Sequence, residues 1–171
     1  GTWGDETSLM IATIDSINNK NDVVIDDIAF NFVAYKNHGT YTPFNEAFGL
    51  DKMTRKAIER YDEERLEPTL CGNKEIESNS AIVLARILPI AYFAVAKKLK
   101  DFEVLEIVSD VCKITHQHDI SVLACYIYVR FIMFLLNGKD KYSAYSMTKC
   151  VDYTMFSEDI VKCFDRLLVE D

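Results

Sequence analysis

The sequence has little glycine and proline, and its two longest apolar segments are each interrupted by an arginine. Its 171 residues include six Gly, three Pro and one Trp. So few breakers exclude a collagen-like or low-complexity chain, and a hydrophobic content of 49% excludes a largely disordered one. Strand-like alternation is rare, whereas helical spacing of apolar residues runs through almost every segment. We therefore expect one all-α domain over residues 1–171.

Basic residues are fewer than acidic ones, and the cysteines do not form a recognisable motif. Asp and Glu number 27 against 19 Lys and Arg, for a net charge of −8, which argues against nucleic acid or an anionic membrane as the main partner. Five Cys occur without C-x-x-C or Cys/His metal spacing, which is typical of reduced thiols, most of them in the core. No signal-type segment is present. We expect a cytoplasmic protein.

Apolar residues at helical spacing predict four amphipathic helices. Residues 7–17, 23–36, 52–61 and a segment through 160–168 each carry one apolar face. Ser157 is the expected N-cap of the last helix. The residues expected to face inward are Leu9, Met10, Ile14 and Ile17 in the first helix, Ile25, Ile28, Ala29, Phe32 and Val33 in the second, Met53, Ala57 and Ile58 in the third, and Ile160, Val161, Phe164, Leu167 and Leu168 in the last.

Two further segments, 81–96 and 120–136, are apolar nearly all round. Each is short for a membrane span and contains an arginine, Arg86 or Arg130. A charge at the centre of a span costs about 2.5–3.5 kcal/mol on insertion scales. We therefore expect a central pair of core helices, with a kink or a helix start near Pro89. Residues 37–48 and 63–80 read as loops.

Three polar segments are candidate sites. In Gly4–Ser8 the side chains of Asp5, Thr7 or Ser8 can cap the helix that follows. The alternative is that Asp5 and Glu6 supply oxygen ligands to a divalent cation. Ser78–Ser80 reads as another cap, or as a phosphate or ribose contact at a helix N-terminus.

The third segment, Thr115–Asp119, lies between two helices. It reads either as Asp119 capping a helix beside two exposed histidines, or as a polar loop that reaches into a ligand cleft. No P-loop, nucleophile elbow or dinucleotide glycine fingerprint occurs. None of the cysteines sits in an activating motif.

Taken in order, these segments resemble the ADP-ribosylglycohydrolase family, which consists of all-α, two-metal hydrolases. Residues 1–9, Gly-Thr-Trp-Gly-Asp-Glu-Thr-Ser-Leu, are similar to the metal motif G-T-W-[ST]-D-D-T-S-[ML]. Further similarities lie at Thr42–Phe44 through Cys71-Gly72, at the R-I-L-P-I-A-Y of Arg86–Tyr92, and at the T-H-x-H of Thr115–His118. The resemblance covers essentially the whole chain.

The resemblance implies an all-α fold, an orthogonal multi-helix bundle, together with a reaction and its site residues. Two metal ions, Mg or Mn, would activate water and hold the ribose diol while an ADP-ribosyl bond to a protein side chain is hydrolysed. Asp5 and Glu6 would be the N-terminal metal ligands and the catalytic carboxylates. Asn79 and His116 would contact the ADP-ribose. An ADP-ribosylated protein or an ADP-ribose-like small molecule is the implied partner, and a second copy of the chain is a further candidate.

The chain departs from the family pattern at several ligands. Gly4 replaces a Thr or Ser, Glu6 replaces an Asp, and Ala81 stands in the place of a ligand-binding Asn unless Asn79 compensates. The family's upstream G-D-A-L-G helix and downstream G-G-D-T-D-T motif are not in these 171 residues, and we expect a piece lacking both terminal segments. We therefore expect impaired catalysis, with no measurable hydrolysis of ADP-ribosyl-arginine. The alternative is a pseudoenzyme that binds an ADP-ribose-like ligand or a protein partner.

Overall fold

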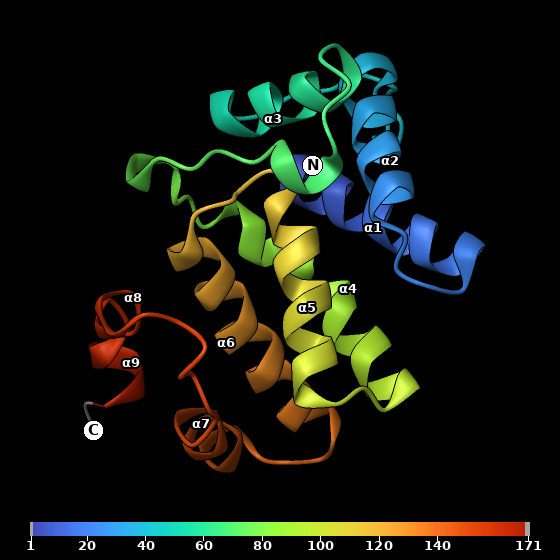
Figure 1. Ribbon diagram of the computed structural model, residues 1–171. Coiled ribbons are helices and arrows are strands. Elements are labelled where there is room, and N and C mark those ends of the chain that lie inside the picture. Colours follow the sequence, from blue (N-terminus) through green and yellow to red (C-terminus); the bar gives the residue numbers. More distant parts are fainter. Residues whose placement is uncertain (1, 170–171) are drawn as a thin grey trace.

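The computed structural model describes residues 2–169, which form an all-α fold (Figure 1). Helices make up 66% of the chain. Over residues 2–169 the only strand-like pairing is an isolated bridge between Asn73 and His116. The predicted fold class is confirmed.

The helices follow one another through short connections. Within the described residues they are α1 (Asp5–Lys20), α2 (Ile25–His38), α3 (Lys52–Asp62), the 3-10 helices η1 (Pro68–Leu70) and η2 (Ile76–Ser78), α4 (Ile82–Lys97), α5 (Asp101–Lys113), α6 (Asp119–Leu136), α7 (Lys141–Lys149), α8 (Glu158–Lys162) and α9 (Asp165–Leu168).

The two nearly all-apolar segments form the centre of the fold, as predicted. Helix α4 packs against α1, α5 and α6, and α6 also packs against α5 and α7. Figure 1 shows α4, α5 and α6 side by side, with α1–α3 at one end and α7–α9 at the other. Pro89 lies inside α4. The expected helix start near this proline is wrong, because α4 already begins at Ile82.

Helix α6 is long and apolar enough to cross a membrane when judged by length and composition alone, with a mean hydropathy of 1.9 over 18 residues. Buried residues make up 44% of this window. Core helices pass the same test, and α6 packs here against three neighbouring α-helices in addition to the short α8.

The buried face of α1 differs from the predicted one. Leu9 is buried as expected, but Ile14 is 39% exposed and Met10 and Ile17 are half-buried. Small hydroxyl residues take their place in the core, where Ser8, Thr13 and Ser16 are buried. The hydroxyls of Ser8 and Thr13 bond back to the preceding turn, whereas Ser16 Oγ has no hydrogen-bond partner. Thr13 Oγ1, for example, donates to the carbonyl of Leu9 over 2.9 Å.

The predicted C-terminal helix is two short helices, α8 and α9. Phe164, between them, has a non-helical conformation (φ −112°, ψ 12°). Its amide donates to Val161 and its carbonyl accepts from Leu167, and such i to i+3 bonds tighten the chain into 3-10 turns. Ser157 holds the N-cap position of α8 without a side-chain bond. The break buries Leu168 and leaves Leu167 41% exposed.

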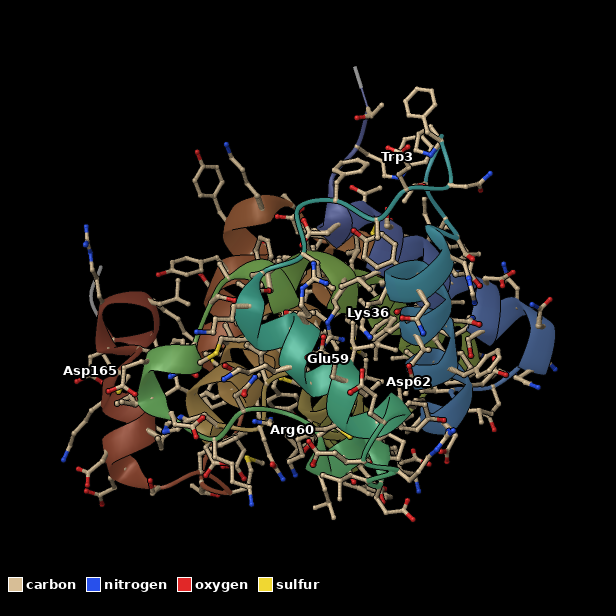
Figure 2. The ribbon with its side chains drawn as sticks, turned by 90° about the horizontal axis from the view of Figure 1, so that it is seen from above. Trp3, Lys36, Glu59, Arg60, Asp62 and Asp165 are labelled. Carbon is tan, nitrogen blue, oxygen red and sulfur yellow. The ribbon has the colours of Figure 1, made fainter. Side chains whose placement is uncertain are left out.

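Helices α2 and α3 are joined by polar contacts on one side (Figure 2). Lys36 lies 3.9 Å from Glu59 and 3.7 Å from Glu63, and Asn37 Nδ2 donates to Asp62 over 3.0 Å. The irregular connection 39–51 runs between these helices, where the sequence predicted a loop over residues 37–48, and α2 continues through His38. This connection borders the candidate site.

Candidate functional site

Asp5 and Glu6 lie in the first turn of α1. The N-cap residue is Gly4, and no side chain caps this helix. The capping role expected for Asp5, Thr7 or Ser8 is therefore wrong, and the Ser8 hydroxyl instead donates back to the carbonyl of Gly4 over 3.3 Å. The first motif residue, Gly1, lies outside the described residues.

The Asp5 carboxylate is buried with one oxygen unpaired. The residue is 5% exposed, and its Oδ2 has no hydrogen-bond partner. Its Oδ1 faces Gly49, where an added Cβ would lie 3.2 Å away. Burial raises the pKa of Asp5 to about 6, with further contributions from a hydrogen bond with Glu6 and from its charge. Among residues 2–169, no Lys or Arg forms an ion pair with either carboxylate.

The acidic pair is a candidate site for one divalent cation. An unpaired buried carboxylate oxygen beside a second carboxylate costs free energy unless a proton or a cation joins them. Mg²⁺ is commonly bound through one or two carboxylates and keeps several waters. Within the described part of the chain, no group of three or more His, Cys, Asp or Glu side chains is placed to hold a metal.

His116 is buried, not exposed as the capping interpretation of its loop required. It is 1% exposed, and burial, followed by the charge of Arg86, lowers its pKa to about 4. The N-cap of α6 is His118, whose Nδ1 accepts from the amide of Ile120, so the predicted capping role of Asp119 is wrong.

A chain of hydrogen bonds runs from the core through His116 to the surface. Arg86 donates to Thr115 Oγ1, Thr115 Oγ1 lies 2.8 Å from His116 Nδ1, and His116 Nε2 lies 3.0 Å from Ser80 Oγ. Thr115 Oγ1 accepts from Arg86 and is fully buried. Its hydroxyl group therefore donates its own hydrogen to His116 Nδ1. Neutral His116 therefore carries its proton on Nε2, donates to Ser80 and leaves the Ser80 hydroxyl free to donate outward.

The Asn79 side chain makes two hydrogen bonds in the loop before α4. Its Nδ2 donates to the Ile76 carbonyl and its Oδ1 accepts from the Ser121 hydroxyl, both over 2.7 Å. The expectation that Ser78–Ser80 cap α4 is wrong, because Ala81 is the N-cap residue and no side chain caps this helix. The side chain of Ser78 lies outside the described residues.

Two motif segments that are distant in sequence lie side by side. The amide of Asn73 donates to Thr115 and its carbonyl accepts from Gln117, over 3.1 and 2.9 Å. Gly72 is required here, since an added Cβ would collide with the Lys113 carbonyl. This pairing fixes the Thr115–His118 loop.

Gly49 and Asp51 interact with the acidic pair and with His116, respectively. Gly49 lies against Asp5. The charge of Asp51 favours a higher pKa of His116, against the larger effects of burial and Arg86. Asn79 bonds to Ser121, and the neighbouring Ser80 bonds to His116.

Sequence reasoning missed several residues of this site. Asp51 bonds to the amides of Met53 and Thr54 through Oδ1 and leaves Oδ2 buried without a partner. Tyr35 is fully buried and donates to the Phe48 carbonyl over 2.7 Å. Burial, then the charge of Asp5, raises the pKa of Tyr35 to about 12. The Phe-Gly dipeptide ahead of Leu50-Asp51 was the available signal for a tight turn.

The family is shown by a match that runs over nearly the whole sequence. The family model for ADP-ribosylglycohydrolase matches residues 1–170. The chain belongs to the ADP-ribosylglycohydrolase family. No curated protein matches the sequence significantly. Membership supports ADP-ribosylated molecules as substrates.

Proposed function

We propose that this ADP-ribosylglycohydrolase-family chain recognises ADP-ribosyl groups on protein side chains in a metal-dependent way, with impaired hydrolysis. The observation that carries the proposal is the buried, unpaired oxygen of Asp5 beside Glu6 in the family's metal motif. Asp5 and Glu6 would hold Mg²⁺ or Mn²⁺. When bound, such a cation supplies Lewis-acid activation of water and a template for the ribose hydroxyls.

The residues around the acidic pair define what the chain itself contributes. Neutral His116 positions the Ser80 hydroxyl as a hydrogen-bond donor at the surface. Both ring nitrogens of His116 hold hydrogen bonds, so this imidazole orients the hydroxyls of Thr115 and Ser80. Among residues 2–169, no third His, Cys, Asp or Glu side chain joins the acidic pair. This supports slow turnover, because metal-bound water is oriented by a complete ligand set.

The test is calorimetric titration of Mn²⁺, and then ADP-ribose, into the chain and into Asp5→Asn. We expect ADP-ribose to bind only with the metal present, and Asp5→Asn to weaken this binding by at least about 10-fold. Asp159→Asn, at a carboxylate whose side chain is 97% exposed on α8, should bind like wild type.

The same proteins are assayed for release of ADP-ribose from ADP-ribosyl-arginine. Binding without release supports the proposal and is also the outcome required by a non-catalytic binding module. Rapid metal-dependent release would contradict the impaired catalysis. Absence of heat from both titrants would overturn ligand recognition.

A further inference from the structure

Gly4 lies directly against the carboxylate of Glu6. A Cβ added to Gly4 would lie 2.7 Å from Glu6 Oε2, closer than real side chains approach. The backbone does not require glycine, because φ −85° and ψ −175° are open to any residue. What Gly4 provides is empty space over its Cα, and the Glu6 side chain fills that space.

The carboxylate that fills this space also interacts with Asp5. Hydrogen bonding and charge from Glu6 contribute, after burial, to the raised pKa of Asp5. Asp5 is 5% exposed, and its Oδ2 has no hydrogen-bond partner. The Glu6 carboxylate therefore lies over the open position at Gly4 and interacts with a buried carboxylate that has one unpaired oxygen.

We infer that Gly4 is a positioning residue for Glu6: the missing side chain at position 4 lets the Glu6 carboxylate lie beside Asp5, where the two hold one divalent cation. This inference rests on the cation of the proposed function. It adds that positions 4 and 6 are one coupled unit, since the longer acid at position 6 needs glycine at position 4.

The geometry separates an effect on metal binding from an effect on folding. The atom in conflict with a new Cβ is the far end of a flexible side chain, which can swing away at little cost. Gly4→Ala therefore leaves the fold intact but moves the Glu6 carboxylate off Asp5. With aspartate at position 6 the side chain is one methylene shorter, and it leaves the space over position 4 free.

The experiment is a double-mutant cycle of Gly4→Ala and Glu6→Asp, with Mn²⁺ binding measured from the electron paramagnetic resonance signal of free Mn²⁺. We expect Gly4→Ala to weaken binding by about 10-fold or more when residue 6 is Glu. Adding Gly4→Ala to Glu6→Asp should change the Kd by less than about two-fold. Thermal unfolding should show Gly4→Ala as stable as wild type.

Equal losses from Gly4→Ala in both backgrounds, or no loss in either, would overturn the inference. If Gly4→Ala leaves Mn²⁺ binding unchanged while Asp5→Asn abolishes metal-dependent ADP-ribose binding, the coupling fails and the proposed function stands. Wild-type protein that binds no Mn²⁺ would overturn both.

Discussion

The pKa of His116 is set by the residues around its side chain. Its imidazole is hidden from solvent and lies between the hydroxyls of Thr115 and Ser80. Protonation would put a donor at Nδ1, which faces the Thr115 hydroxyl hydrogen, and would bring a second positive charge near Arg86. The low pKa of His116 has this local cause as well as burial.

The folded protein should therefore lose stability as pH falls from about 6.5 toward 4. The unfolded imidazole takes up its proton near pH 6.5 and the folded one only near 4, so the unfolded state binds more protons in this window. At roughly 1.4 kcal/mol per unit of pKa, the full effect is about 3 kcal/mol. Above pH 6.5 the contribution is constant.

Urea unfolding of wild type and His116→Gln at pH 7 and pH 5 checks this expectation. The difference between the two proteins should shrink at pH 5, because the variant has no imidazole to protonate. Identical pH slopes for wild type and His116→Gln would contradict it. His38 and His118 are present in both proteins and cancel in the comparison.

At this scale the motifs supplied the candidate residues Asp5, Glu6, Asn79 and His116, and their joint role in one site stays a prediction. The bond of Asn79 to Ser121 was not predictable, because folding alone brings these two residues together. His118 caps α6 through the nearby amide of Ile120, although histidine is not among the preferred N-cap residues.

Between elements, Arg86 links α4 to the end of α5. Its guanidinium donates to the Val111 and Cys112 carbonyls over 3.1 and 3.2 Å and to the Thr115 hydroxyl, and it lies 5.3 Å from the centre of the Phe32 ring. The last carbonyls of a helix lack partners within it and carry partial negative charge. Arg86 thus satisfies the end of α5 without a carboxylate among the described residues.

Replacing this arginine should be costly. Arg86→Met removes three hydrogen bonds and leaves buried acceptors unpaired, so we expect the free energy of unfolding to fall by about 3–5 kcal/mol. Arg166→Met, at an exposed arginine of α9, is the matched control and should change it by less than about 0.5 kcal/mol. Equilibrium urea unfolding measures both, and a loss below about 1 kcal/mol at Arg86 would refute the linking role.

Helical periodicity predicted the elements but misjudged two of their faces. It located α2 and α3 because their apolar residues are also the buried ones, as with Phe32 and Ile58. In α1 it ranked Ile14 above Ser16, yet Ser16 is fully buried. Periodicity counts a small hydroxyl as polar and ignores the close packing of α1 on α4 that a small residue permits.

Over the whole molecule, one connected core joins helices from both ends. The buried cluster includes Leu9 of α1, Ile90 of α4, Val129 of α6 and Leu168 of α9. A single core of this kind is expected to unfold as a unit. One domain over residues 1–171 stays a prediction, which this continuous core supports for the described residues 2–169.

Thermal unfolding should accordingly be a single transition. The far-ultraviolet circular dichroism of the helices and the near-ultraviolet signal of the tyrosines, including the Tyr126–Tyr153 pair, should give the same midpoint. Two separated midpoints, with α7–α9 melting apart from α1–α6, would contradict a single domain.

The molecule has two exposed thiols at one end. Cys71, Cys112 and Cys125 are buried, whereas Cys150 and Cys163 are exposed. The exposed pair adjoins α7 and α8, at the opposite end from the N-terminus in Figure 1. A maleimide dye or a surface tether will therefore attach at that end of the unaltered chain and leave α1, which carries Asp5 and Glu6, away from the attachment for optical measurement of ligand capture.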